Sequence, residues 1–267
     1  MRLRPLHLIG IVALLMALVL SGCGGGNQKK VTIGVKFDQP GLSMKNPDGS
    51  MSGFDVDVAK HVAEQLGYKP DEIEWKEAPS GQRETLIQNG QVEYVVGTYS
   101  ITPERKQKVG FAGPYFQTGQ SLLVREDNTD IVGPESLTGN KKVCSVSGST
   151  PAQRIKDKYP DVQLQLFDTY SACVDALKSG RVDAVTTDAV ILAGYAAQSP
   201  GTMKVVGQPF SMELYGIGLA KDNNDLRAKI NDALQKMIDS GAWQAAFDKN
   251  LGPSGYKAPP APQIDRY

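Results

Sequence analysis

Arg105 occupies an unusual position for a cation, the first turn of a predicted helix. Thr102 can cap this short helix and Pro103 can open it. A cation in a first turn opposes the helix dipole, which favours acidic residues there. The position suggests a nearby anion, and the alternative is a surface arginine neutralised by Glu104.

Arg83 repeats the same pattern at a second predicted helix. It follows Ser80-Gly81-Gln82 and stands at the helix start. Two arginines placed in this way suggest two carboxylates. The alternative for Arg83 is a solvated position beside its neighbour Glu84.

These residue types match the needs of a free amino acid. Its recognition requires a cation for the α-carboxylate, a carboxylate for the ammonium group, and spare backbone or hydroxyl donors. Catalysis has little support, because His61 lies in a predicted helix with no nucleophile motif nearby. Cys144 and Cys173 lie far apart, without metal-ligand spacing. We therefore expect a binding protein that is not an enzyme and uses no metal or cofactor.

The N-terminus has the pattern of an export signal. Arg2 and Arg4 precede an apolar run, 8–20, whose 13 residues are too few to span a bilayer. The run ends in Leu-Ser-Gly-Cys, which resembles the lipobox of bacterial lipoproteins. That resemblance implies a signal peptide over 1–22, acylation of Cys23 and a flexible tether over 23–30.

Composition narrows the class further. The chain has 29 basic and 29 acidic side chains, and removal of residues 1–22 leaves 27 basic ones. We expect no nucleic-acid partner, because no basic run with interleaved aromatic residues is present.

In an oxidising compartment Cys144 and Cys173 are candidates for a disulfide, with two buried thiols as the alternative.

Short β-branched runs alternate with helical patterns, which indicates two α/β layers. The expected strands are 31–35, 73–75, 94–96, 142–146, 163–167 and 182–186, with 120–124 and 214–219 as extended segments that link the halves. The expected helices are 55–66, 81–89, 151–158, 171–179, 188–197 and 225–238. The proline-rich segment 252–267 is predicted to be a disordered tail.

Three ordered motifs carry a resemblance to a known family. They are Gly53-Phe54-Asp55-Val56-Asp57-Val58, Thr98 to Arg105 with Phe111-Ala112-Gly113-Pro114-Tyr115, and Asp183 to Asp188. Together they resemble the polar amino-acid solute-binding proteins of ABC importers, over about 31–251. The resemblance implies an α/β, two-lobed periplasmic-binding-protein fold, whose two sheets are joined by two hinge strands. Lobe 1 would comprise 31–121 and 215–251, and lobe 2 would comprise 122–214.

The family pattern assigns roles to several residues of this chain. It implies that Arg105 binds the ligand α-carboxylate, assisted by Ser100 and the backbone of Thr98, and that Asp188 takes the α-ammonium group. The loop containing Ser149 and Thr150 would add donors from lobe 2 at a helix start.

Further segments are similar to the glutamate-binding lipoproteins of Gram-positive uptake systems. They are 36–41, 82–90 and 144–151. In the branch of the family that binds glutamate and aspartate, an arginine at the position of Arg83 holds the side-chain carboxylate. A histidine of the glutamate and aspartate binders falls at Tyr170 here, and Lys36 is a candidate for the missing positive charge. The branch also implies a bridge between Cys144 and Cys173.

The resulting expectation is a monomeric receptor on the outer face of the cytoplasmic membrane, held there by its lipid anchor. It would bind glutamate, then aspartate, and deliver the ligand to the membrane permease of an ABC importer. A receptor for glutamine or asparagine, or a sensor subunit feeding a membrane kinase, remains an alternative. An enzyme on the same fold is a third possibility, because fold does not fix function. It is a poorer match, because the charges of these residues suit an amino acid.

Overall fold

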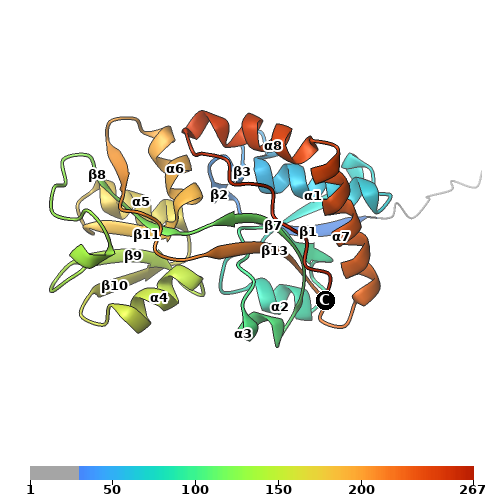
Figure 1. The fold of residues 1–267 in the computed structure, drawn as a ribbon, viewed down its shortest axis with the longest axis horizontal. Coiled ribbons are helices and arrows are strands. Elements are labelled where there is room, and N and C mark those ends of the chain that lie inside the picture. The colour runs from blue at the N-terminus through green and yellow to red at the C-terminus, as the bar shows by residue number, and fades with distance from the viewer. Residues whose placement is uncertain (1–29) are drawn as a thin grey trace, which may run out of the picture.

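The computed structural model describes residues 30–267 and divides them into two α/β lobes (Figure 1). The sheet of lobe 1 has the strand order β5-β1-β6-β13-β7. Its strands are β1 (Val31–Val35), β5 (Ile73–Glu77), β6 (Tyr94–Val95), β7 (Gly110–Thr118) and β13 (Glu213–Leu219). Strand β1 is parallel to β5 and β6, whereas β13 is antiparallel to both of its neighbours.

The sheet of lobe 2 repeats this plan with the order β10-β9-β11-β8-β12. Its strands are β8 (Gln120–Arg125), β9 (Lys142–Val146), β10 (Gln163–Phe167), β11 (Ala184–Asp188) and β12 (Met203–Val206). A third, small sheet of β2 (Asp38–Gln39), β3 (Ser43–Lys45) and β4 (Met51–Ser52) follows β1 in the chain.

Helices pack on both sheets through apolar residues spaced at one helical turn. In α1, Val58, Ala59 and Val62 are fully buried, as the periodicity predicts. The helices are α1 (Phe54–Gln65), α2 (Arg83–Gln88), α3 (Pro103–Lys106), α4 (Thr150–Lys158), α5 (Tyr170–Lys178), α6 (Ala189–Gln198), α7 (Asn224–Asp239) and α8 (Ala242–Asn250). Short 3-10 turns occur at η1 (Pro70–Glu72), η2 (Pro134–Ser136) and η3 (Gly252–Ser254).

The chain crosses between the lobes twice. Strand β7 of lobe 1 continues through Gly119 into β8 of lobe 2, and the chain returns from β12 to β13. The two crossings lie side by side, because Thr118 at the end of β7 pairs with Glu213 at the start of β13. The two-lobed α/β architecture expected from the sequence is confirmed.

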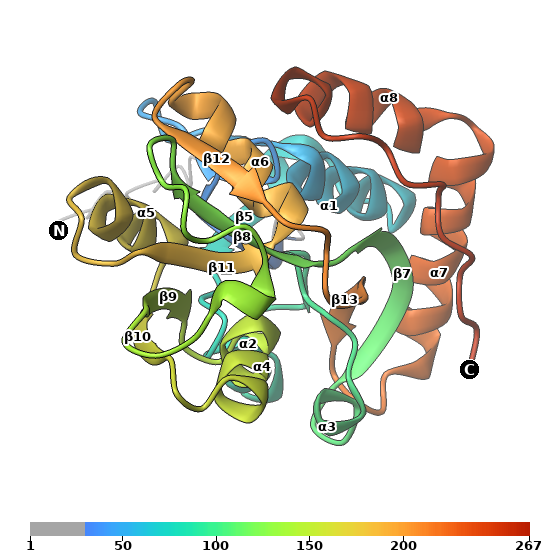
Figure 2. The same ribbon diagram turned by 60° about the vertical axis from the view of Figure 1, so that its left-hand side comes forward.

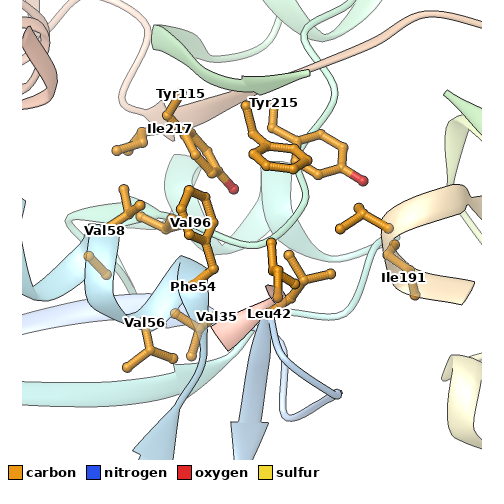
Figure 3. Close-up of a cluster of buried hydrophobic side chains, with 14 of the residues drawn as sticks. Val35, Leu42, Phe54, Val56, Val58, Val96, Tyr115, Ile191, Tyr215 and Ile217 are labelled. Carbon is orange, nitrogen blue, oxygen red and sulfur yellow. The ribbon is translucent and has the colours of Figure 1, made fainter. Parts of the chain in front are cut away.

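A continuous hydrophobic core extends across the lobe junction (Figure 3). Phe54 of α1 packs against Phe116, with ring centroids 5.3 Å apart, and edge-on against Trp243 at 5.6 Å. Ile191 of α6, in lobe 2, approaches the same cluster as Tyr215 of β13. Apolar burial therefore contributes to holding the lobes together.

The C-terminal segment, predicted to be disordered, instead lies along lobe 1 (Figures 1 and 2). Ile264 is buried, and the backbone of Asp265 donates to the carbonyl of Gly113 at the edge of the sheet. The Tyr267 ring lies under the cations of Lys106 and Arg227, at 3.9 and 4.4 Å. The proline-rich composition of the segment predicts disorder and does not indicate these few anchoring side chains.

A disulfide links Cys144 of β9 to Cys173 of α5, with the two Cα atoms 5.5 Å apart. It fastens the helix that begins at Tyr170 to the sheet of lobe 2. Within residues 30–267, no helix is both long and apolar enough to cross a membrane. The predicted signal peptide and acylated Cys23 lie outside the described residues.

Candidate amino-acid site between the lobes

A cavity lies where the lobes meet, and both lobes line it. Lobe 1 contributes Ser80, Arg83 and Thr98; lobe 2 contributes Ser149, Thr150, Pro151, Tyr170, Thr187, Asp188 and Ile191. Six of the nine ligand-binding residues predicted from the sequence are in this lining: Arg83, Thr98, Ser149, Thr150, Tyr170 and Asp188. Of the other three, Lys36 and Ser100 contact the lining residues Ser80 and Thr150. Arg105 is one step further away and contacts Ser100.

Arg83 is the first residue of α2, and its side chain is buried. Its Nη1 donates to the carbonyls of Gly97 and Thr98, at 3.0 and 3.3 Å, and its Nε donates to the carbonyl of Ser80 at 3.4 Å. Within the described part of the chain it forms no ion pair. Burial, and then the charge of Arg105, lower the pKa of Arg83 to about 10, so the group stays cationic at neutral pH.

Lys36 follows β1 and adds a second buried amine beside this cation. Its Nζ donates to Ser80 Oγ at 2.9 Å. Burial, and then the charge of Arg83, lower the pKa of Lys36 to about 7. Its charge near neutral pH therefore depends on the charges around it.

Arg105 lies in the first turn of α3, where Thr102 caps the helix by accepting from the Arg105 amide at 3.2 Å. Its Nη1 donates to the carbonyl of Ser100 at 2.8 Å. The side chain is largely buried, and its Nε lies 3.5 Å from an oxygen of Glu84, not of the neighbouring Glu104. The surface alternative is therefore wrong for this arginine, as it is for Arg83.

Thr98 has a positive φ of 45°, which is uncommon for a residue with a branched side chain. The buried carboxylate of Asp55 holds it, accepting from the Thr98 amide at 2.9 Å and from the Tyr115 hydroxyl at 2.9 Å. This conformation directs the Thr98 carbonyl towards Arg83. Strain of this kind persists where the surroundings impose it, often at binding sites.

Asp188 ends β11 and stands at the N-cap position of α6, but its side chain does not cap the helix. Its Oδ2 accepts from the Tyr215 hydroxyl at 2.5 Å, whereas Oδ1 is buried and has no hydrogen-bond partner within residues 30–267. The neighbouring Thr187 Oγ1 is likewise buried and unpaired. Burial, and then the charge of Glu213, raise the pKa of Asp188 to about 7.

The remaining predicted residues lie at two helix starts of lobe 2. Ser149 caps α4 by accepting from the Ala152 amide at 3.1 Å. Thr150 Oγ1 donates to Glu213 at 2.9 Å and lies 3.2 Å from Ser100 Oγ. Tyr170 opens α5, and burial, followed by the charge of Asp188, raises the pKa of its phenol to about 12.

Direct contacts join the lobes around the cavity. Arg105 Nη2 in lobe 1 donates to the Gly148 carbonyl in lobe 2 at 2.9 Å. Asp38 of the small sheet accepts from the Ser171 amide of α5 at 3.1 Å and from the Tyr195 hydroxyl of α6. The structure is therefore a closed arrangement of the two lobes.

Four lining residues were not predicted as site residues: Ser80, Pro151, Thr187 and Ile191. Each lies next to a predicted residue or one turn away from it, so the motifs contain them without marking their roles. Size does not distinguish the site: the interlobe cavity has a volume of about 10 Å³, whereas a groove of about 610 Å³ lies between α1 and α8. That groove is lined by lobe 1 alone, and the described residues contain no cluster suited to a metal ion.

The arrangement suits a small zwitterion with an additional negative charge. Two guanidinium groups and one amine approach the cavity from lobe 1, and one carboxylate with a free oxygen faces it from lobe 2. A ligand with an ammonium group and one or more carboxylates would complete these charges. Its enclosure between the lobes would remove it from water.

Comparison with known proteins places the chain among relatives of this architecture. The model of the bacterial extracellular solute-binding proteins, family 3, matches residues 31–253. The glutamate-binding protein GluB of Corynebacterium efficiens is 50% identical, covering 90% of this chain and 88% of that protein. The glutamine-binding protein GlnH of Bacillus subtilis is 34% identical and covers 92% and 97% of the two chains.

Solved structures show the same fold. An ancestral arginine-binding protein bound to glutamine superposes with a TM-score of 0.79 at 37% identity, covering 84% of this chain and 98% of that one. The ancestral amino acid-binding protein AncCDT-1 superposes with a TM-score of 0.76 at 30% identity, over 84% and 95%. The chain therefore belongs to the bacterial extracellular solute-binding proteins of family 3, and it is a binding protein, not an enzyme.

Proposed function

We propose that this chain is an exported, lipid-anchored receptor that binds an acidic amino acid and delivers it to an ABC-type importer. Glutamate is the preferred ligand and aspartate the second. One observation carries the proposal: the Arg83 guanidinium is buried at the interlobe cavity and forms no ion pair within residues 30–267. A ligand with a second carboxylate would supply that partner.

The head group of the ligand uses residues from both lobes. Arg105 binds the α-carboxylate, together with the Ser100 hydroxyl and the backbone at Thr98. Asp188 takes the α-ammonium group, since its Oδ1 and the adjacent Thr187 Oγ1 are acceptors without a hydrogen-bond partner among the described residues. The donors at Ser149 and Thr150 close over the ligand from lobe 2.

The side chain of the ligand reaches the opposite cations. Arg83 binds the side-chain carboxylate, and Lys36 adds positive charge beside it through the shared contact with Ser80. Tyr170 forms part of the cavity wall. The 50% identity to a glutamate-binding protein supports the same assignment.

Glutamine is the second candidate, because a glutamine-binding relative is 40% identical over 73% of this chain. Charge opposes it. An amide would leave the buried Arg83 without an ionic partner, a penalty of about 1 to 3 kcal/mol, which is roughly tenfold or more in affinity.

Calorimetric titration of the exported protein, purified in detergent, tests this proposal. Glutamate should bind tightest, followed by aspartate, with glutamine and asparagine at least about tenfold weaker. A preference for either amide over its acid would overturn the acidic assignment.

Anchoring at the outer face of the cytoplasmic membrane rests on the lipobox at Cys23. A Cys23→Ala variant should carry no fatty-acid label and should be released or left unprocessed. Continued labelling of that variant would exclude Cys23 as the acylated residue.

A further inference from the structure

Tyr99 does not line the cavity, but its ring contacts Arg83, which does, and also Arg105. The ring centroid lies 4.1 Å from the guanidinium carbon of Arg83 and 5.0 Å from that of Arg105. An aromatic face attracts a cation placed over it, and desolvation strengthens the attraction. Tyr99 is fully buried, so both contacts are shielded from water.

The two guanidinium groups carry like charges close together. Their mutual repulsion is visible at Arg83, whose pKa is lowered first by burial and then by the charge of Arg105. Glu84 offsets part of this charge, but it pairs with Arg105 and not with Arg83. The Tyr99 ring is therefore the favourable contact that both cations share.

The position of the ring is itself fixed. It packs edge-on against Phe111, with centroids 4.8 Å apart. The Tyr99 carbonyl accepts from the Gly216 amide at 2.9 Å. On the other side, Gly218 leaves the necessary room, because a Cβ atom there would lie 2.6 Å from Cε1 of the ring.

The Tyr99 hydroxyl points to the neighbourhood of the Glu84 carboxylate. It is buried and has no hydrogen-bond partner within residues 30–267. Burial, and the nearby Glu84 carboxylate, raise the pKa of Tyr99 well above its usual value, although Arg83 acts in the opposite direction. The phenol is therefore neutral, and the aromatic face is the part of the side chain that acts on the arginines.

We infer that Tyr99 is a positioning residue for dicarboxylate recognition. Its ring holds Arg83 and Arg105 as a pair with a set separation, so that one ligand can engage both with its two carboxylates. This inference rests on the proposed function, because only an acidic amino acid needs the two arginines at once. A monocarboxylate ligand such as glutamine requires Arg105 alone.

Two substitutions distinguish the effect of the aromatic ring from that of an apolar side chain at this position. Tyr99→Leu keeps an apolar side chain but removes the aromatic face, and Tyr99→Phe keeps the face and removes only the unpaired hydroxyl. Titrations with glutamate and glutamine, together with the melting temperature, are measured for each variant of the exported protein. Tyr99→Leu should weaken glutamate by about tenfold or more and glutamine clearly less. Tyr99→Phe should stay within about threefold of wild type for both ligands.

A double-mutant cycle with Arg83→Gln makes the test specific to positioning. In the Arg83→Gln background, Tyr99→Leu should lower glutamate and glutamine affinity by the same factor, because the second anchor is already gone. If Tyr99→Leu lowers the affinity for both ligands equally in the wild-type background and also lowers the melting temperature, Tyr99 has a merely structural role. That result would overturn the inference and leave the glutamate preference intact. A wild type that prefers glutamine would overturn the proposed function and this inference together.

Discussion

Lys36 and Asp188 are both buried at the lobe junction, and in each case burial is the main cause of a pKa of about 7. An acidic amino acid would affect the two groups in opposite ways. Its side-chain carboxylate would favour the charged amine and raise the pKa of Lys36. Its ammonium group would favour the charged carboxylate and lower the pKa of Asp188.

Glutamate affinity should therefore be greatest near pH 7. As the pH rises from 7 to 8.5, Lys36 loses its proton in the free protein and binding must recover it, so affinity falls by up to about tenfold per pH unit. As the pH falls from 7 to 6, Asp188 must release a proton and affinity falls again. Calorimetry between pH 6 and 8.5 measures both limbs.

The variant Lys36→Gln supplies the control. This variant should abolish the decline in glutamate affinity above pH 7 and leave the decline below pH 7 unchanged. Binding that is independent of pH in wild type, or an alkaline decline that persists in Lys36→Gln, would contradict the role of this amine.

The sequence singled out Arg83 and Arg105 because a cation at a helix start is an exception that needs a reason, and the family resemblance then favoured a ligand role for both. It could not locate Tyr99 or Thr187 as part of the site. A tyrosine after a strand is an ordinary core residue until its ring is seen over two guanidinium carbons. A threonine beside an acidic residue is equally ordinary until its hydroxyl is seen to be buried with no partner in the part of the chain that the structure describes.

Among the structural elements, the loop before α4 lies directly against lobe 1. Gly148 has a φ of 74°, and a Cβ atom on it would lie 2.6 Å from the Cα of Gly81 in lobe 1. Gly148→Ala should therefore hold the lobes apart and weaken all amino-acid ligands alike, by at least about tenfold. Titrations with glutamate and glutamine measure the loss.

Gly139→Ala is the matched control for backbone strain. Gly139 is in the same lobe with a φ of 62°, but nothing lies within 4 Å of its Cβ position. Both variants should lose a similar amount of stability, about 1 to 2 kcal/mol, while only Gly148→Ala loses affinity. Equal affinities for the two variants would rule out a steric role of Gly148 in closure.

The disulfide between β9 and α5 stabilises lobe 2. It closes a loop with a sequence separation of 29, and its removal should cost about 3 to 4 kcal/mol of unfolding free energy on the chain-entropy model. Both tryptophans, Trp75 and Trp243, lie in lobe 1. In denaturant titrations of a Cys144→Ala, Cys173→Ala double variant, circular dichroism should therefore shift more than tryptophan fluorescence. Identical shifts of the two signals would show that the bridge does not act on lobe 2 selectively.

Periodicity predicted most helices and many strands to within a few residues, but it missed the short strands β2, β3, β4 and β12 and also β7 and α8. The last two were missed for physical reasons. Pro114 interrupts the alternation of β7, although that strand lies at the sheet edge where proline is tolerated. Helix α8 follows Gly241 directly and buries only Trp243, Ala246 and Phe247. A short apolar stripe after a glycine is a weak indication of a helix when the surface that it covers is not known.

On the scale of the whole molecule, the proposed ligand site is a property of the closed pair of lobes. Arg83 and Arg105 belong to lobe 1 and Asp188 to lobe 2, and Tyr215 reaches across the junction to hold the Asp188 carboxylate. The two-lobed plan could be predicted from alternating strands and helices and from the family resemblance. The docking of the C-terminal segment on lobe 1 could not, because it depends on single contacts such as that of Ile264.

The central claim is that Arg83 binds the side-chain carboxylate of the ligand while Arg105 binds the α-carboxylate common to all amino acids. The most direct measurement is the ratio of glutamate to glutamine affinity in wild type, Arg83→Gln and Arg105→Gln, by calorimetry at pH 7. We predict that wild type favours glutamate by roughly tenfold or more, that Arg83→Gln removes most of this preference, and that Arg105→Gln weakens both ligands together. An Arg83→Gln variant that keeps the wild-type ratio, or that weakens glutamine as much as glutamate, would contradict the claim.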